Sequence, residues 1–294
     1  MNITIVGPGA VGCLWAYHLA TRGHHVSLWG RETRTEKQIQ LDQQPGMTLA
    51  YNQTLELQNS DLVLVTVKAW QVEEALNPLA AEIHSDCIVM LMHNGMGTAD
   101  WLLERFPNNP LLLATTTHGA LRLSDAIISH TGKGVSHIGA LNPKGKQCQF
   151  IEAVFAHCLP DVNWCEDIHQ ALWNKLAINC AINPMTAKYA IRNGELAQDI
   201  YQHELIQVVG EVQQVMQAEG ILISLESLQE KVDTVVRLTA NNWSSMQQDI
   251  EHRRHSEIDF ISGYLLDRAQ AHQLELPYNQ ALYNHILHVE QSFD

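Results

Sequence analysis

The chain has 294 residues, of which 46% are hydrophobic and 17% charged, and its formal net charge at pH 7 is −14. This acidic balance and the lack of a basic cluster argue against a nucleic-acid partner. The sequence holds no apolar run of the roughly 18 residues that a membrane span needs, and its first residues lack the basic flank of a signal peptide. We therefore expect a cytoplasmic protein without a membrane partner, long enough for two domains.

Cysteine and histidine patterns give no sign of a disulfide framework or a metal site. The six cysteines are scattered without a C-x-x-C pair, and we interpret all of them as reduced, structural thiols. The 16 histidines include no H-E-x-x-H motif, and pairs such as His24 with His25 lack a third ligand at a recognised spacing. We expect no metal.

The chain opens with the pattern of a strand, a glycine loop and a helix. An apolar run at 2–6 predicts the strand, and an apolar helical pattern follows the loop. The loop residues are Gly7, Pro8, Gly9, Ala10, Val11 and Gly12. A G-x-G-x-x-G motif in this context is typical of dinucleotide binding, with Gly7 at the tight turn, Gly9 beside the pyrophosphate and Gly12 where helix and strand pack closely. The pyrophosphate would lie at the helix N-terminus, which favours an anion.

The end of the second predicted strand, 25–29, decides between the two nicotinamide cofactors. Gly30, Arg31, Glu32 and then Arg34 stand there. An acidic residue would hydrogen-bond the ribose hydroxyls of NAD, whereas an arginine would pair with the 2′-phosphate of NADP. Because Arg31 comes first and Arg34 supports it, we expect NADP(H). Glu32 keeps NAD open, and both charges could also be merely solvated.

The chain then becomes less regular and predicts at most a short hairpin from 47–51 and 54–57. A nearly continuous apolar run at 62–67 is typical of a central parallel strand. Lys68 follows it, and a helix is predicted from about 72 to 82. Open α/β sheets bind ligands at the carboxyl ends of their strands, so Lys68 is a candidate for ligand binding.

Two further strands bring polar or glycine-rich ends to the same edge of the sheet. The strand 87–92 leads into His93-Asn94-Gly95-Met96-Gly97, and the strand 111–117 leads into His118-Gly119-Ala120. Asn94 could hydrogen-bond both a cofactor and a substrate. Each end alone is more often an ordinary loop, but three successive ones favour a ligand site.

A hairpin from 126–130 and 135–138, a helix near 147–158 and a strand near 162–165 complete the first predicted domain. Only helical patterns follow. We therefore predict an α/β fold, with a Rossmann-type doubly wound domain at 1–166 and an all-α domain at 167–294, and expect the ligand between them. The later helical stretches are 205–217, 225–240, one from Ser244 to about His272, and a short one after Pro277.

The stretch from Trp173 to Pro184 is apolar almost throughout, yet it carries Lys175, Asn179 and Asn183 four residues apart. On an α-helix these three side chains share one face of an otherwise buried helix. A buried ammonium and two buried amides are costly unless something pairs with them, and the stretch contains no acidic residue. Their partner is either a ligand or, alternatively, water or another part of the chain.

Together these motifs resemble the ketopantoate reductases over nearly the whole chain. The segments that carry the resemblance are 7–12, 68–71, 93–97, 173–187, 193–195, 244–246 and 257–259. The resemblance implies reduction of ketopantoate to (R)-pantoate with NADPH, a step in pantothenate and coenzyme A synthesis. The segments 118–121 and 31–61 match the family pattern less clearly, which concerns the adenosine pocket.

The resemblance also implies roles for single residues, with Lys175 as the general acid. The substrate would be held by Lys175, Asn179, Asn183, Asn193, Ser245 and Asn94. The cofactor would be held by residues 7–12 together with Arg31, Lys68, Asn94, Ala120 and Glu257. Ser244 and Ser245 are both plausible helix caps, and only one of them need face the substrate.

The residue types agree with this chemistry. Hydride transfer to a C2 ketone leaves negative charge on its oxygen, and an ammonium such as that of Lys175 both stabilises the charge and supplies the proton. Two other functions stay open: a reductase of the same plan that acts on another 2-oxo or 3-hydroxy acid, and a nucleotide-sensing protein without turnover. The intact set of Lys175, Asn179 and Asn183 favours an enzyme. The sequence indicates no oligomeric state.

Overall fold

The computed structural model describes residues 1–293. Its contacts divide the chain into two compact units. The first comprises Met1–His93 and Thr98–Ala171, and the second comprises Asn94–Gly97 and the residues from Leu172 onward. The first unit is α/β and the second is helical, so the predicted fold class is confirmed. The transition along the chain falls within one helix, α6 (Ile168–Tyr189).

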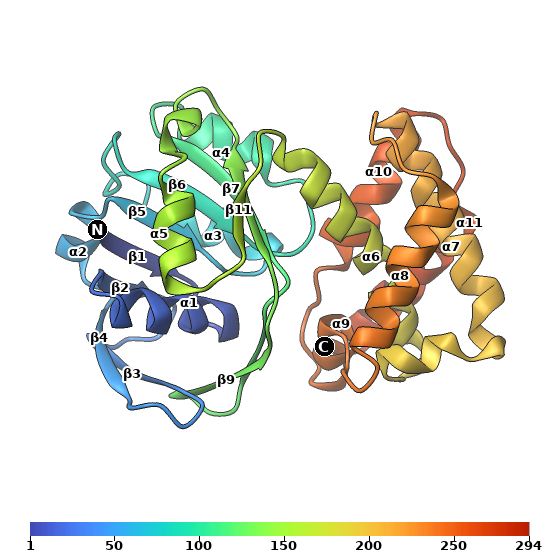
Figure 1. Ribbon diagram of the computed structural model, residues 1–294, viewed down its shortest axis with the longest axis horizontal. Coiled ribbons are helices and arrows are strands. Elements are labelled where there is room, and N and C mark those ends of the chain that lie inside the picture. Colours follow the sequence, from blue (N-terminus) through green and yellow to red (C-terminus); the bar gives the residue numbers. More distant parts are fainter. Residues whose placement is uncertain (294) are drawn as a thin grey trace. The chain divides into compact units, whose positions relative to one another are not determined.

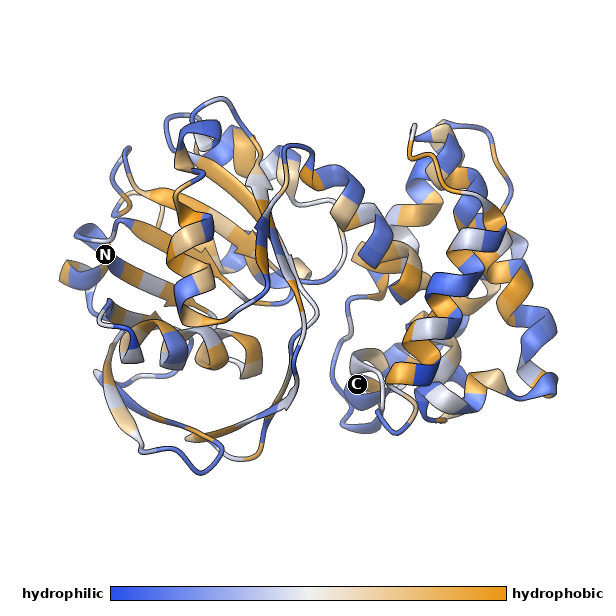
Figure 2. Ribbon diagram, viewed as in Figure 1, coloured by the Kyte–Doolittle hydropathy of each residue, from blue (hydrophilic) through white to orange (hydrophobic). Residues whose placement is uncertain are grey.

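An eleven-strand sheet forms the first unit, in the order β11-β10-β7-β6-β5-β1-β2-β4-β3-β9-β8 (Figure 1). Its strands are β1 (Asn2–Val6), β2 (His25–Trp29), β3 (Glu36–Leu41), β4 (Met47–Tyr51), β5 (Leu62–Val65), β6 (Ile88–Met92), β7 (Leu111–Thr116), β8 (Gly119–Arg122), β9 (Ile127–Gly132), β10 (Ser136–Ala140) and β11 (Val162–Trp164). The central strands β2, β1, β5, β6 and β7 are parallel. Because both faces of such strands are covered, β5, β6 and β7 are buried along their whole length and stand out as hydrophobic in Figure 2.

Helix α1 (Ala10–Thr21) is the centre of the first unit. It contacts β1, β2, β3, β8, β9 and the helix α5 (Ile151–Cys158). Trp15 is fully buried there and packs on Phe155 with ring centroids 4.8 Å apart. Three shorter helices, α2 (Thr54–Gln58), α3 (Val72–Leu76) and α4 (Ala99–Arg105), connect the strands. The sheet is therefore wrapped around the helix that follows the glycine loop.

Two predicted hairpins are wrong, although three of their four segments are strands. The segments near 126–130 and 135–138 are β9 and β10, but β9 pairs with β8 and β3, whereas β10 pairs with β7 and β11. The link between β9 and β10 runs against the link between β7 and β8: a Cβ at Gly134 would lie 2.3 Å from the carbonyl carbon of Thr117. The lack of a side chain at Gly134 therefore allows these two links to pass closely, where a turn was predicted.

The predicted hairpin of 47–51 with 54–57 fails because the second segment is helix α2, and β4 pairs antiparallel with β3. Asn52, with φ 53°, ends β4 in the left-handed region. Its side chain accepts a hydrogen bond from the Gly30 N–H at 2.9 Å and donates one to the Glu32 carbonyl at 2.8 Å. Asn52 thereby fixes the chain that leaves β2.

Two predicted helices are too long. Helix α3 ends at Leu76, well short of residue 82. Asn77 still has helical backbone angles, but Pro78 after it has no backbone N–H with which to continue the helical hydrogen bonds. The long helix predicted from Ser244 to His272 is broken into α9 (Ser245–Glu251), a π-helical segment (Asp259–Gly263) and α10 (Tyr264–Ala271). Arg253 interrupts it with φ 52°, a left-handed conformation that a helix interior does not adopt.

The second unit packs α6 with α7 (Asp199–Ala218), α8 (Leu225–Leu238), α10 and α11 (Pro277–Glu290) around one apolar core. Helix α6 lies deep in it, with Cys180, Ala181 and Met185 fully buried. Among the described residues, no helix is long and apolar enough to cross a membrane. The six cysteines are free thiols, and burial raises the pKa of Cys13 to about 11.

Candidate active site

A cavity of about 450 Å³ lies in the first unit where β1, β2 and β5 end. Gly7 and Gly9 follow β1, Arg31 follows β2 and Lys68 follows β5, and all of them line its wall, together with Pro8. The ligand edge of the sheet predicted from the sequence is therefore hollow, and five of the predicted cofactor residues line it: Gly7, Pro8, Gly9, Arg31 and Lys68.

The glycine loop leaves backbone N–H groups accessible at the start of α1. Gly7 turns with φ 91°, and its N–H donates to the Trp29 carbonyl at 2.9 Å. A Cβ at Gly9 would have no neighbour closer than 4.0 Å, so this position is open, whereas a Cβ at Gly12 would lie 2.4 Å from the Gly7 carbonyl oxygen. No side chain caps α1. A bare loop before an uncapped helix N-terminus suits a pyrophosphate.

Charged residues form the part of the wall beyond β2. Arg31 is exposed, and Glu32, Lys37 and Arg122 line the same cavity. The Lys37 side chain is only 1% exposed and its Nζ lies 2.6 Å from the Asp125 carboxylate. Sequence reasoning missed Lys37, Arg122 and Asp125. The available signal was the alternation of buried residues in β3, in which Lys37 occupies an inward position.

Ala120 is placed differently from the other predicted cofactor residues. It lies on β8 and packs against the apolar core of the first unit. Its neighbour two residues further along, Arg122, reaches the cavity wall. Ala10 and Val11 form the first turn of α1.

In the second unit, Lys175, Asn179 and Asn183 occupy successive turns of α6. The first two are half-buried and Asn183 is 7% exposed. Burial lowers the pKa of Lys175 to about 8, and the negative charge of Glu257 opposes that shift. At pH 7 a group with this pKa is still about nine-tenths protonated. The α6 face therefore carries an acid that is able to give up its proton near neutral pH.

Glu257 is itself buried, and Asn94 donates a hydrogen bond to its Oε2 at 3.0 Å. The loop that holds Asn94 is fixed by the π-helical segment, because the Met96 N–H donates to the Phe260 carbonyl at 2.8 Å. Gly95 has φ 79°, and a Cβ there would lie 2.4 Å from that same oxygen. Only glycine allows the loop to come this close to the Phe260 carbonyl. Gly95 therefore helps to hold the neighbouring Asn94 beside Glu257.

A second carboxylate supports Glu257. Glu290 of α11 accepts a hydrogen bond from the Ser256 N–H at 2.9 Å and lies 3.1 Å from His255 Nδ1. Because Ser256 directly precedes Glu257, these contacts fix the backbone that carries the buried acid. Sequence reasoning missed Glu290, because it is separated from Ser256 by 34 residues and stands in an ordinary amphipathic helix pattern.

The two other predicted substrate residues, Asn193 and Ser245, come from other segments of the second unit. Asn193 is buried, and its Nδ2 donates to Thr239 Oγ1 at 2.9 Å. Its buried Oδ1 has no hydrogen-bond partner among the described residues. Ser245 is exposed at the start of α9, while the buried Ser244 caps that helix by accepting from the Gln247 N–H at 3.1 Å. Of the two serines, Ser245 is the one left for another role.

Comparisons with known proteins cover nearly the whole chain. The family described as ketopantoate reductase PanE/ApbA matches residues 3–143, and the family described as ketopantoate reductase PanE/ApbA C terminal matches residues 167–290. A 2-dehydropantoate 2-reductase from Vibrio cholerae is 46% identical over 294 residues, which cover 100% of this chain and 99% of that protein.

Solved structures share the fold. A PanE/ApbA family ketopantoate reductase from Ralstonia eutropha has a TM-score of 0.89 at 24% identity, covering 100% of this chain and 99% of that one. A D-mandelate dehydrogenase, solved with NADH and anilino(oxo)acetate, has a TM-score of 0.90 at 21% identity, with the same coverage. At these two levels of sequence identity, the structural similarity shows a shared fold and nothing more. The family matches and the full-length relative go further, and the chain belongs to the ketopantoate reductase family.

Proposed function

We propose that the chain reduces 2-dehydropantoate (ketopantoate) to (R)-pantoate with NADPH, and that Lys175 donates the proton. The observation that carries this proposal is the state of Lys175. A half-buried amine with a pKa of about 8 shares one helix face with two amide side chains. Such an amine is charged at neutral pH and still acidic enough to transfer its proton.

A reduced nicotinamide, when bound, supplies the hydride. The Lys175 ammonium stabilises the oxyanion that develops on the C2 oxygen and then protonates it. Glu257 favours the charged form of Lys175, and the Asn94 amide in turn holds Glu257. Asn179 and Asn183 donate hydrogen bonds to the carboxylate and hydroxyl of the substrate, while Asn193 and Ser245 complete the set of substrate residues.

The cavity of the first unit suits the cofactor. Its glycine loop presents an open backbone and an uncapped helix N-terminus to a pyrophosphate. We assign the 2′-phosphate to the end of β2, where Arg31 lines the wall, and this assignment selects NADP(H). Lys68 lines the same cavity, and we assign Lys68, Asn94, Ala120 and Glu257 to cofactor binding.

The loss of NADPH absorbance with ketopantoate tests the proposal directly. The same assay is run with NADH and with a panel of other 2-oxo acids, because a D-mandelate dehydrogenase shares this fold. We expect the highest kcat/KM for ketopantoate with NADPH. A higher value for another acid would change the substrate, and tight NADPH binding without turnover of any acid would favour a nucleotide sensor.

A further inference from the structure

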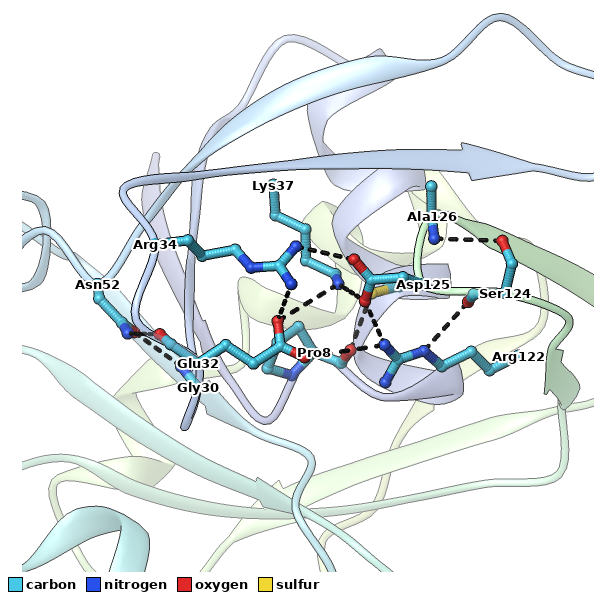
Figure 3. A network of polar contacts seen from close by, with 11 residues as sticks. Pro8, Gly30, Glu32, Arg34, Lys37, Asn52, Arg122, Ser124, Asp125 and Ala126 are labelled. Atoms are coloured by element: carbon cyan, nitrogen blue, oxygen red, sulfur yellow. Dashed lines mark hydrogen bonds and ion pairs between the residues drawn. The ribbon is translucent and has the colours of Figure 1, made fainter.

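Five charged side chains from separate parts of the chain meet at the rim of the cavity (Figure 3). Glu32 and Arg34 follow β2, Lys37 lies on β3, Arg122 ends β8 and Asp125 follows it. Glu32, Lys37 and Arg122 line the cavity. We call these five residues the rim cluster. Three cations and two carboxylates give it a positive balance beside the position of Arg31.

Asp125 is the carboxylate of the rim cluster that contacts all three cations. Its Oδ1 lies 2.6 Å from Lys37 Nζ and also contacts Arg122, and its Oδ2 lies 2.8 Å from Arg34 Nη1. The hydrogen bonds from Lys37 and Arg34 hold its pKa well below the usual range. Asp125 therefore stays ionised and fixes the three cations relative to one another.

Glu32 is bound in a different way. Its carboxylate lies 2.5 Å from Arg34 Nη2 but 4.0 Å from both Lys37 Nζ and Arg122 Nη2. The Glu32 side chain is 43% exposed, against 1% for Lys37. The Glu32 carboxylate thus faces Lys37 and Arg122 across the cavity rim at about 4 Å, which is longer than a hydrogen bond. A second anion that enters the cavity would compete with it for the same two cations.

We propose that Lys37 and Arg122 attract the 2′-phosphate of the cofactor, and that Glu32 competes with this phosphate and so sets the selectivity between NADPH and NADH. The inference rests on the proposed use of NADPH and extends it to residues beyond Arg31. Because Lys37 is buried and held by Asp125, its ammonium is preorganised for an incoming phosphate. Glu32 must move away from the rim, or its charge repels the phosphate at short range.

Two nucleotide probes test this without turnover: adenosine 2′,5′-bisphosphate and adenosine 5′-monophosphate, which differ only in the 2′-phosphate. Their Kd values for the full chain are measured by isothermal titration calorimetry. We expect Glu32→Gln to tighten bisphosphate binding by roughly tenfold and to change monophosphate binding by less than about twofold. Glu36→Gln is the matched control, because Glu36 is exposed beside the buried Lys37 and so on the opposite face of β3. It removes the same charge and should leave both constants unchanged.

A second variant tests the cation. Lys37→Met removes the ammonium but keeps an unbranched chain that is only one atom shorter. It should weaken bisphosphate binding by about tenfold or more, with little effect on the monophosphate. Lys146→Met, at an exposed position that does not line the cavity, is its control. Circular dichroism and thermal unfolding show whether each variant is folded. The Glu32→Gln variant keeps all three cations, so its binding constants still test the proposal even if Lys37→Met does not fold.

The outcomes separate this inference from the proposed function. If the wild-type chain prefers the bisphosphate but neither Glu32→Gln nor Lys37→Met alters that preference, NADPH use stands and the rim cluster has no part in it. If the wild type shows no preference but Glu32→Gln creates one, Glu32 is the competitor and the proposed NADPH selectivity is wrong. If Glu32→Gln instead weakens monophosphate binding tenfold, Glu32 binds the ribose hydroxyls and the inference is overturned.

Discussion

The rim cluster and the α6 face use charge in opposite ways. At the rim, five charged groups largely neutralise one another, and four of their side chains are between 33% and 50% exposed. On α6 the amine of Lys175 is withdrawn from water, and the Glu257 carboxylate is near enough to raise its pKa. Charges in contact with water are screened and suit the recognition of an anion, whereas a desolvated amine has a shifted pKa and suits proton transfer. Selectivity is therefore expected at the rim and chemistry on α6.

Removal of the amine should give the largest effect. Lys175→Ala should lower kcat by roughly a hundredfold or more, because the general acid is lost. Binding of adenosine 2′,5′-bisphosphate should stay unchanged, since that probe uses the first unit. Lys188→Ala, on the same helix but paired with Glu204, is the control and should keep kcat within about twofold. Nearly normal turnover of Lys175→Ala would remove Lys175 from the mechanism.

The second-largest effect is expected for cofactor binding at the end of β2. Arg31→Ala should weaken NADPH binding by about tenfold and NADH binding much less, because only NADPH carries the 2′-phosphate. Fluorescence titration of each reduced cofactor measures both constants, and kcat at saturation should be nearly unchanged. Equal losses for the two cofactors would mean that the phosphate is bound elsewhere.

A smaller effect distinguishes the two serines at the start of α9. Ser244→Ala removes the cap and the acceptor of the buried Thr186 hydroxyl, 2.7 Å away, and should lower the free energy of unfolding by about 1–2 kcal/mol. Ser245→Ala should change stability by less than about 0.5 kcal/mol and raise KM for ketopantoate. Urea unfolding and steady-state kinetics measure these two quantities. A destabilised Ser245→Ala with a normal KM would reverse the assignment.

A change in ionic strength should give the smallest effect, and it should act on cofactor selectivity at the rim but not on proton transfer at Lys175. Raising the salt concentration from about 50 to 500 mM should reduce the preference for NADPH over NADH by a few-fold, because the rim is in contact with water. The half-buried Lys175 is shielded from mobile ions, so the pH dependence of kcat/KM should hardly move. A salt-insensitive preference would place the phosphate in a desolvated site.

Local patterns carried most of what the sequence predicted. The glycine loop and the i, i+4, i+8 series on α6 are contiguous in sequence, so spacing alone identified them. The rim cluster is not: Lys37 and Asp125 are separated by 88 residues and meet because β9 pairs with β3. The wrong hairpin between β9 and β10 concealed that pairing. Single-sequence periodicity specifies a strand but not its partner.

The break between α9 and α10 had the same origin. A helical pattern runs through residues 252–256, but Glu290 binds the Ser256 N–H from another helix, and Arg253 turns into a left-handed conformation. Such a tertiary contact overrides local propensity. It also places Glu257, so a segment where the helix prediction failed is one that shapes the candidate site.

The pH dependence of kcat/KM for ketopantoate tests the central claim most directly. Because a general acid must be protonated, kcat/KM should be level below the Lys175 pKa of about 8 and fall about tenfold per unit above it. Glu257→Gln removes the charge that raises this pKa, so the falling limb should move to lower pH. A profile that stays level to pH 10, or a limb that Glu257→Gln leaves in place, would contradict the account of Lys175 as the proton donor.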